Sequence, residues 1–547
     1  MDKPKAVVVL DHFKELLGGR SNFDTFWQTL HNYFYIESPD ISSSYAPGAE
    51  LNADYLFDAT TLESADILAS GFMNYLTPPT SKWFKLRHKN PAYSENKPVT
   101  DYLEKVADEV YHTLNNSNFY DQILPAYKSS GVYGTSILLE EEDATDEARF
   151  FNMPIKQVCI AEDARGRIKE YYIEFEYTAW QAATRWGKEA LSQSMQDEDE
   201  SRKEDKKHKL LLFIGERSKR LIDKSDRSNM PLEALWIDVE AKKVIDEGGY
   251  HEFPAMAHRF DKRAFLPWGF SPAMKALPFA RMLAAITKTS LRAFMKHTDP
   301  PIAIPNDCFI MPLNMNPRAV NAYKAEAMGQ HGIMPFGNYG KLDAAQWSIE
   351  YYTKQVKSLM YNDVFLAFEG LDKQMNNPEV MERINEKMTM LGPAVGRFTA
   401  EVLNPIIIRT IGILHRRGKL PPPPDEIMND PTYEIAYVSQ LAQAQKRSEM
   451  NSLVTALTMT GQMAQYAPAV LDKVDHDKAV DEVWNVTGAP ARVLRDDEEI
   501  GKIREQRAQE QAQAQEMAMA GALAQTGKDA ASADKSMAEA KVVGKQK

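Results

Sequence analysis

Two long helical patterns separated by a short irregular segment constrain the fold of this chain more than any other feature. Apolar residues recur at helical spacing over 272–298 and again over 346–368. At a rise of about 1.5 Å per residue, these helices would be about 39 Å and about 35 Å long. The segment between them, 299–345, is rich in Pro, Gly, Asn and Met, and such residues favour turns and loops. We therefore expect a stalk of two similar helices that carries a compact head.

The region before the stalk combines helical and extended patterns. Apolar residues recur every three or four positions in three early segments, which predicts helices at 23–35, 54–76 and 101–114. Alternating, aromatic or β-branched runs predict strands at 131–140, 154–160, 168–177, 209–214 and 234–237. The mixed-charge run 196–209 is typical of a solvated loop or hairpin. The expected fold class is therefore α+β, predominantly helical.

The overall charge limits how the chain can meet a nucleic acid. The 547 residues carry 65 basic and 77 acidic side chains, for a net charge of −12. This balance argues against tight wrapping of DNA over most of the surface, but it suits a channel whose wall lets a polyanion slide. The chain is longer than a single hydrophobic core usually accommodates, so several structural regions are expected. No apolar run approaches the roughly 20 residues needed to cross a bilayer, and we see no targeting signal.

Motifs that would indicate catalysis or a bound cofactor are absent from the sequence. It contains no phosphate-binding loop, no zinc-protease His pair, no nucleophile elbow and no paired CxxC. Cys159 and Cys308 are too few for a disulfide framework or a Cys-based zinc site, and they favour a reducing compartment such as a bacterial cytoplasm. His258 near Asp261 is more typical of a surface hydrogen bond than of a catalytic triad. The acidic run 140–143 lacks the spacing of a calcium loop. We expect no catalytic residue, no cofactor and no metal site.

One basic cluster stands out within the first stalk helix. Its four members are separated by seven, four and four positions, which at about 100° per residue places them within about 80° of arc; they are Arg281, Lys288, Arg292 and Lys296. No Asp or Glu occurs between 272 and 298, and the opposite side of the helix is apolar, with Leu283, Ile286, Leu291 and Phe294.

Two interpretations of this basic stripe stay open. It could line a DNA channel, or it could pair with acids of a neighbouring copy, for instance Glu350 or Asp363. Both interpretations require a ring, because a lone stalk would leave its apolar and basic faces in water.

A second mixture of basic and aromatic residues surrounds Trp83 and Phe84. Aromatic side chains among bases can stack on single-stranded nucleic acid. Here we expect both rings to anchor a core or an interface, with the charges outside.

Five segments occur in an order typical of one protein family. They are RSNFDTFWQTLHNYF at 20–34, GFMNYLTPPTSKWFKL at 71–86, GVYGTSILLEEED at 131–143, the segment 267–305 that begins PWGFSPAMKALPF, and LGPAVGRFTAEVLNPIIIRTIGILHRRGKLPPPP at 391–424. With this ordered set the chain resembles the head-to-tail connecting proteins of short-tailed bacteriophages, which are portal proteins. The resemblance extends from about residue 20 to about residue 424, and no single segment would suffice.

The resemblance implies a portal architecture for this chain. It divides the sequence into a wing (1–271), a first stem helix (272–298), a clip (299–345), a second stem helix (346–368), a tunnel loop (369–379), a long wing helix (380–424), a crown (425–505) and a low-complexity tail (506–547). Interior prolines should kink the long helix at Gly392-Pro393 and Asn404-Pro405. The candidate tunnel-loop residues are Asp372, Lys373, Gln374, Asn376 and Asn377. The candidate docking residues of the clip are Met311, Met315 and Met334, for which core filling is an equal alternative.

The function implied by the resemblance is structural. Copies of the chain would form a dodecameric ring at one capsid vertex of the virion, assembled in the host bacterial cytoplasm and without a membrane. Double-stranded DNA would pass through its channel during packaging and ejection. Its partners would be a terminase motor, tail adaptor or nozzle proteins, and the major capsid and scaffolding proteins. A tail adaptor or another virion structural protein is one alternative; a DNA-processing enzyme is another, disfavoured by the missing nucleotide and metal motifs.

Overall fold

The structure divides into two units that are described separately. The computed structural model describes residues 4–39, 41, 55–94, 96–200, 206–220, 226–305, 314, 316, 318–323, 334–335, 342–369, 391–438, 455–463, 466, 479–480 and 500–513. The first unit comprises Met1–Ser439 and the second Gln440–Lys547. Helices and antiparallel sheets together confirm the α+β class. Within the described residues, no helix has both the length and the apolar character needed to span a membrane.

Of the three predicted helices near the N-terminus of the first unit, two are longer than predicted and the one predicted at 54–76 is shorter. The helices observed there are α1 (Lys5–Phe34), α2 (Thr60–Leu76), α3 (Pro91–Ser94), α4 (Lys97–Asn116) and α5 (Phe119–Tyr133). The helix expected at 23–35 is only the second half of α1, and α5 was not expected. Trp27, Trp83 and Phe84 are fully buried in the main core, so the prediction that Trp83 and Phe84 are anchors is confirmed.

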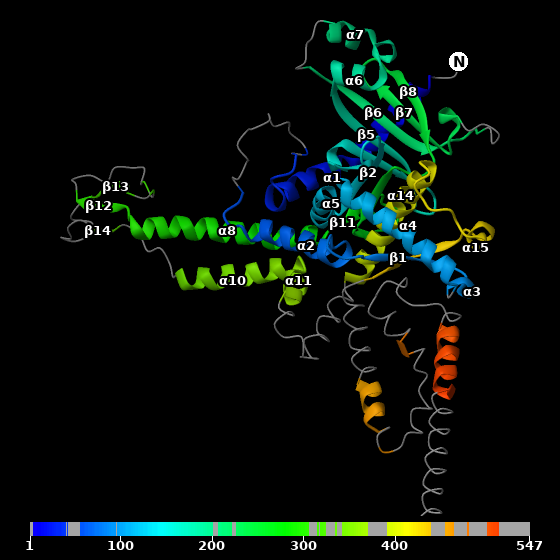
Figure 1. The fold of residues 1–547 in the computed structure, drawn as a ribbon. Coiled ribbons are helices and arrows are strands. Elements are labelled where there is room, and N and C mark those ends of the chain that lie inside the picture. Colours follow the sequence, from blue (N-terminus) through cyan, green and yellow to red (C-terminus); the bar gives the residue numbers. More distant parts are fainter. Residues whose placement is uncertain are drawn as a thin grey trace, which may run out of the picture. The chain divides into compact units, whose positions relative to one another are not determined.

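Two antiparallel sheets lie beside these helices (Figure 1). The smaller has the strand order β3-β2-β9, formed by Glu147–Met153, Thr135–Asp143 and Ala255–Arg259. The larger is a meander in sequence order, formed by β4 (Val158–Glu162), β5 (Ile168–Thr178), β6 (Lys207–Glu216), β7 (Leu232–Asp238) and β8 (Lys243–Tyr250). On one face of this meander, Leu10 and Phe13 of α1 form a separate small core with Tyr172 and Phe213.

Two expectations about this region were wrong. The strand expected at 131–140 begins only at Thr135, because Gly131 to Tyr133 are the last turn of α5 and Gly134 reverses the chain with φ +82°. A side chain at Gly134 would also collide with the backbone of Gly269. The charged run 196–209 is not simply a loop, since it begins in α7 (Gln193–Glu200), which follows α6 (Ala179–Trp186), and ends in β6. Its Asp199 is largely buried and pairs with Lys188 at 2.7 Å.

The stalk consists of α8 (Pro272–Thr298) and α10 (Leu342–Leu359), which lie side by side (Figure 1). The short strands β10 (Asp261–Lys262) and β11 (Gly269–Phe270) precede α8. The bounds of α8 are those predicted. The single helix predicted at 346–368 is wrong, because Tyr361 has φ +59° and separates α10 from α11 (Asn362–Glu369). This break lets the ring of Phe365 pack against Phe72 and over Gly71 of α2.

A small sheet follows α8 at its C-terminal end (Figure 1). Its strand order is β13-β12-β14, from Val320–Tyr323, Ile302–Pro305 and Met334–Pro335, with β12 and β13 parallel. Asn321 is buried there and bonds the backbone of Asn314 through both ends of its amide. Arg318 pairs with Asp299, the residue that caps α8, at 2.8 Å.

In the C-terminal part of the first unit, the described residues confirm the predicted long helix from 391 to 416, whereas 417–424 are not helical. A helix at 391–398 continues through a π-helical turn, Thr399–Leu403, into α14 (Asn404–Arg416). The π-helical turn lies directly before Pro405, which lacks the amide proton that a regular helix needs there. After α15 (Asp425–Asn429), β15 (Tyr433–Tyr437) pairs antiparallel with β1 (Phe84–His88). This strand therefore belongs to the first unit, and the crown stays a prediction.

The second unit contributes little to the described structure. Its described helices cover 455–463 and 500–513, and their side chains are mostly exposed. The first residues of the predicted tail, 506–513, are helical. The rest of the predicted tail lies outside the described residues.

Candidate functional site

The first half of α8 is anchored in the core of the first unit. Its buried side chains are Pro272, Ala273, Met274, Ala276, Leu277, Ala280 and Leu283. Ser271 caps the helix, because its hydroxyl accepts from the Met274 amide at 3.0 Å and donates to the Val132 carbonyl at 2.6 Å. Pro272 fits the first turn, where no amide donor is needed. The base of the stalk is therefore fixed to α5.

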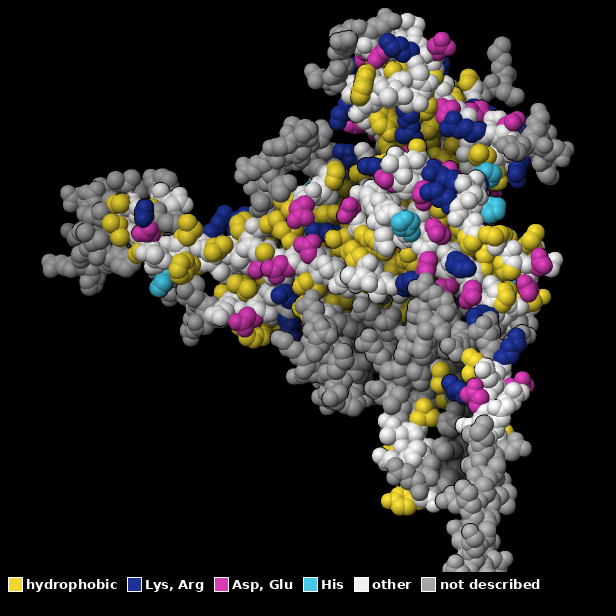
Figure 2. All heavy atoms as spheres, in the orientation of Figure 1, with side chains coloured by type: hydrophobic (Ala, Val, Ile, Leu, Met, Phe, Trp, Pro, Cys, Tyr) yellow, Lys and Arg dark blue, Asp and Glu magenta, His cyan; other side chains and the backbone are white. Residues whose placement is uncertain are grey.

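The second half of α8 exposes large apolar side chains. Leu291, Phe294 and Met295 are each about half exposed or more, with Phe294 at 57%. On α10, Trp347 is 68% exposed, and its ring stacks on that of Tyr351 at 5.7 Å. Yellow apolar side chains are visible along this helix pair in Figure 2. Exposed apolar surface of this kind marks sites of protein association.

The predicted apolar side of α8 is thus not one uniform surface. Leu283 is 1% exposed and belongs to the folded unit, whereas Leu291 and Phe294 face solvent. The reason is that α8 extends beyond the core that covers its first half. The apolar positions of this side therefore lie in two different environments.

All four residues of the basic stripe lie along α8, as predicted. Arg281 and Arg292 are exposed, and Lys288 and Lys296 are half-buried. The ammonium of Lys288 lies 4.8 Å from the ring centre of Phe57, a cation–π contact. Within the described part of the chain, none of the four forms an ion pair. Glu350, a suggested partner, instead accepts a hydrogen bond from Gln346. Both interpretations of the stripe therefore stay open.

The other predicted site residues can be placed only in part. Met334 lies in β14, opposite Ala303 of β12. Met311 and Met315 lie outside the described residues. So do the tunnel-loop candidates Asp372, Lys373, Gln374, Asn376 and Asn377.

A buried contact between a carboxyl group and a guanidinium, not foreseen from the sequence, joins α14 to β2. Glu140 and Arg409 are both fully buried, with 3.9 Å between a carboxylate oxygen and Nε. Arg409 donates to the backbone carbonyls of Glu140 at 3.2 Å and Glu252 at 3.1 Å, and Thr410 donates to the Glu140 carboxylate at 3.0 Å. Burial raises the pKa of Glu140 to about 8, against the opposing effect of Arg409. Glu140 thus has a structural role, and among the described residues no acidic, His or Cys cluster could hold a metal.

A second ionic cluster fixes the π-helical turn. Glu401 accepts from the backbone amide of Arg259 at 2.9 Å and from its Nε at 3.1 Å. The same guanidinium also pairs with Glu162 of β4, and that carboxylate contacts Lys262 at 2.6 Å. The turn therefore ties the helix that begins at 391 to both sheets. An acid inside a helical run was the only sequence signal for this contact.

The histidine beside Asp261 is part of the core and does not form the surface hydrogen bond expected. The His258 ring is buried, with Nδ1 2.5 Å from the Ser130 hydroxyl. Burial lowers its pKa to about 3. The Asp261 carboxylate is instead 4.0 Å from Arg397. This geometry provides no third group for a triad, because Asp261 does not orient the ring.

Comparisons with known proteins identify the family of this chain. The sequence profile of the family described as bacteriophage head to tail connecting protein matches residues 9–494. The chain is 29% identical over 508 residues to the portal protein of Salmonella phage epsilon15, covering 92% of this chain and 91% of that protein. It is 27% identical over 509 residues to the probable portal protein of Bordetella phage BPP-1, with the same two coverages. The chain therefore belongs to the family of bacteriophage head to tail connecting proteins.

Proposed function

We propose that this protein is the portal subunit of a short-tailed bacteriophage. Its family and the names of its relatives support this function. The structural observation that carries the proposal is the outer half of α8, where apolar side chains are exposed and the bases are unpaired within the described chain. A portal is a structural connector and not an enzyme.

The active form is a closed ring, with α8 and α10 as its stem. A ring buries the apolar side chains of one stalk against the next, which removes their contact with water. The portal resemblance favours a dodecamer that surrounds a channel for double-stranded DNA. In this arrangement the stripe of α8 either lines the channel or pairs with the neighbouring stalk.

The small sheet β13-β12-β14 and the segments around it form the clip, where the terminase motor and later the tail adaptors dock. Arg318 stabilises its junction with α8 through Asp299. The two sheets and the N-terminal helices form the wing, which meets the major capsid and scaffolding proteins. The assembled ring occupies one capsid vertex in the virion, after assembly in the bacterial cytoplasm.

Negative-stain microscopy of the purified full chain tests this function directly. We expect closed rings with a central channel and projecting wings, and class averages that show twelvefold symmetry. Particles without a channel would favour a tail adaptor or another virion structural protein. Nucleotide hydrolysis or DNA cleavage by the purified chain would favour a processing enzyme.

A further inference from the structure

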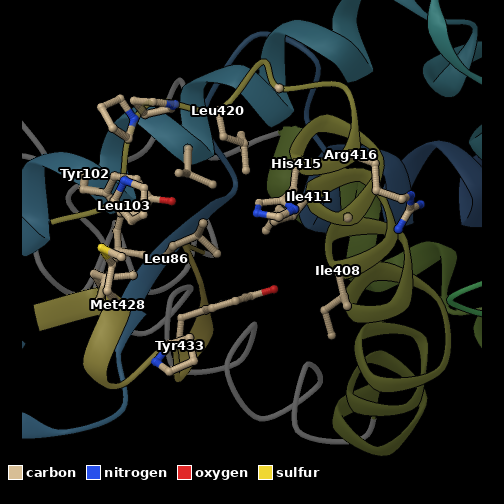
Figure 3. Close-up of a pocket in the computed structure, with 18 of the residues that line it drawn as sticks. Leu86, Tyr102, Leu103, Ile408, Ile411, His415, Arg416, Leu420, Met428 and Tyr433 are labelled. Atoms are coloured by element: carbon tan, nitrogen blue, oxygen red, sulfur yellow. The ribbon is translucent and has the colours of Figure 1, made fainter. Parts of the chain in front are cut away.

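An apolar groove of about 630 Å³ lies on the first unit, between α4, α14 and the segment 418–433. Figure 3 shows Ile408 and Ile411 of α14 across the hollow from Leu86 and Leu103. At its rim, Ile408 is 44% exposed and Met428 is 68% exposed. This volume lies in the range of sites that enclose a compact apolar group. The groove can therefore hold a large side chain.

The rim of the groove is acidic. The segment 425–434 on one side carries Asp425, Glu426, Asp430 and Glu434 and no base. Bases beside the groove are paired within the chain: Arg416 with Glu252 at 2.8 Å and Glu142 at 3.0 Å, and Lys419 with Glu147. An apolar group that enters the groove is therefore favoured when basic residues flank it.

Elsewhere on the same chain, one exposed aromatic ring is preceded by basic residues. Phe265, between β10 and β11, is 99% exposed. Its backbone has φ +62°, a conformation that is uncommon for a bulky residue and is concentrated at functional positions. Lys262 and Arg263 precede it. Because Phe265 is fully exposed, it does not fill the groove of its own chain.

The loop that carries Phe265 is held at both ends. Lys262 pairs with Glu162 at 2.6 Å on one side. On the other side, Trp268 is buried against Trp27, with 5.0 Å between ring centres. The Arg263 guanidinium stacks 3.6 Å from the centre of the Phe270 ring. The exposed ring is thus presented by an ordered loop, which lowers the entropy lost when it binds.

We propose that Phe265 of one subunit inserts into the apolar groove of the neighbouring subunit, as a contact at the level of the wing. A ring joins two different patches of each subunit, so a projection and a matching hollow on one chain are the elements it requires. Arg263, which has no carboxylate partner among the described residues, then faces the acidic segment 425–434. This inference rests on the proposed ring, and adds a contact outside the stem.

Photo-crosslinking in the full-length protein tests the contact. A benzoylphenylalanine at position 265 should crosslink, within assembled rings, to peptides of another copy that contain Ile408 or Met428. The matched control carries the same group at Trp180, another exposed aromatic, 61% exposed, and should not label those peptides. If rings form but their crosslinks map elsewhere, or no crosslink joins two subunits, this contact is wrong. The proposed ring would not be affected by that result. Absence of rings in the unmodified protein instead overturns the proposed function.

A double-mutant cycle provides a second test. Phe265→Ser and Ile408→Asp should each raise the midpoint concentration for ring assembly by at least about tenfold, as expected for loss of an aromatic anchor. Both positions are exposed, so the thermal unfolding of the monomer should not change. The midpoint concentration for ring assembly should be no higher for the double variant than for the single variants, because the effects of substituting two residues in contact do not add. Additive effects of the two substitutions on ring assembly would overturn the proposal. Normal ring assembly of Ile408→Asp would also overturn it, because the groove would then not be a contact between subunits.

Discussion

The two halves of α8 belong to one continuous helix but have opposite surroundings. The first half, to Leu283, packs into the core of its own chain. The second half, from Ala284, exposes Leu291, Phe294 and Met295. A helix this long gains no stability from apolar side chains that remain in water. The first half is therefore explained by the monomer, whereas the second half fits the proposed ring.

The basic residues follow the same division. Around the two sheets, Arg259, Arg409 and Arg416 each contact at least one carboxylate, and Arg409 does so when fully buried. On α8, the bases of the stripe have no ion pair within the described residues. Paired bases lock elements of one subunit together, whereas unpaired bases are free to meet another molecule. Substitutions in the two regions should consequently affect different measurements.

The largest expected effect is on the fold, from Leu283→Asp. This change places a charge in the buried half of α8 and should lower the free energy of unfolding by about 3–5 kcal/mol or more. Urea or thermal denaturation of the monomer measures the loss. Leu283→Met is the matched control, because it conserves volume and should cost less than about 1.5 kcal/mol. A normal unfolding curve for the Asp variant would show that this half is not buried.

The second effect should appear in assembly and not in the fold. Phe294→Asp changes an exposed residue, so monomer stability should stay within about 0.5 kcal/mol. Ring assembly should nevertheless fail, because a charge would enter the apolar contact between stalks. Mass photometry separates rings from monomers, and Phe294→Leu should retain rings. If the Asp variant assembles normally, the outer half of α8 is not a subunit contact.

A pH series tests the buried pair of the wing. Because the pKa of Glu140 is raised to about 8, the folded protein keeps a proton that the unfolded chain releases above about 4.5. Stability from this group is complete below about pH 4.5 and is lost as the pH rises towards 8. His258 acts in the opposite direction, since its lowered pKa makes the fold less stable below about pH 6.5. Glu140→Gln should remove the loss of stability that occurs as the pH rises towards 8, and should leave the loss below about pH 6.5 that His258 causes.

The control for this series is Glu142→Gln, on the same strand. Glu142 is 43% exposed and pairs with Arg416 at 3.0 Å. Its replacement should leave the slope between pH 5 and pH 8 almost unchanged, because exposed pairs contribute only about 0–1 kcal/mol. Equal slopes for wild type and Glu140→Gln would mean that Glu140 is ionised in the fold.

The parts predicted correctly from sequence are those governed by local patterns. The bounds of α8 follow from its Ser-Pro start, its apolar period and the two prolines beyond Asp299. The strand β15 was missed because Tyr433, Ile435 and Tyr437 are explained only by their partner β1, which is over 300 positions away. The break at Tyr361 was missed because it depends on a contact between distant segments of the chain. It allows Phe365 to reach Gly71, and no local pattern around Tyr361 indicates that contact.

The candidate site was predictable to a similar degree. The stripe is a property of one helix, so its spacing could be read directly. Glu140 and Arg409 are separated by more than 260 positions, and their burial depends on how α14 crosses β2. In the sequence, Glu140 is one of four consecutive acids, and nothing marks it as the buried one. Phe265 gave no sequence signal either, because exposure and a positive φ are properties of the folded loop.

The smallest effect on the monomer, and the sharpest distinction, should come from replacing Arg281, Lys288, Arg292 and Lys296 together by Gln. None is ion-paired within the described chain, so the unfolding of the monomer should change by no more than about 0.5 kcal/mol per site. If the stripe faces DNA, rings should form normally while the length of packaged DNA changes. Lys275→Gln, an exposed base on the same helix but off the stripe, is the control.

If the stripe instead pairs with acids of the neighbouring stalk, the same variant leaves those acids unpaired in the seam between subunits. Their repulsion is least screened at low salt, so rings should loosen as salt is lowered and recover near 1 M, where the screening length is about 3 Å. Mass photometry across a salt series, together with the length of packaged DNA, therefore separates the two interpretations. Normal rings and normal packaging at every salt concentration would contradict both, because the outer half of α8 would then carry its charges only as a solvated surface.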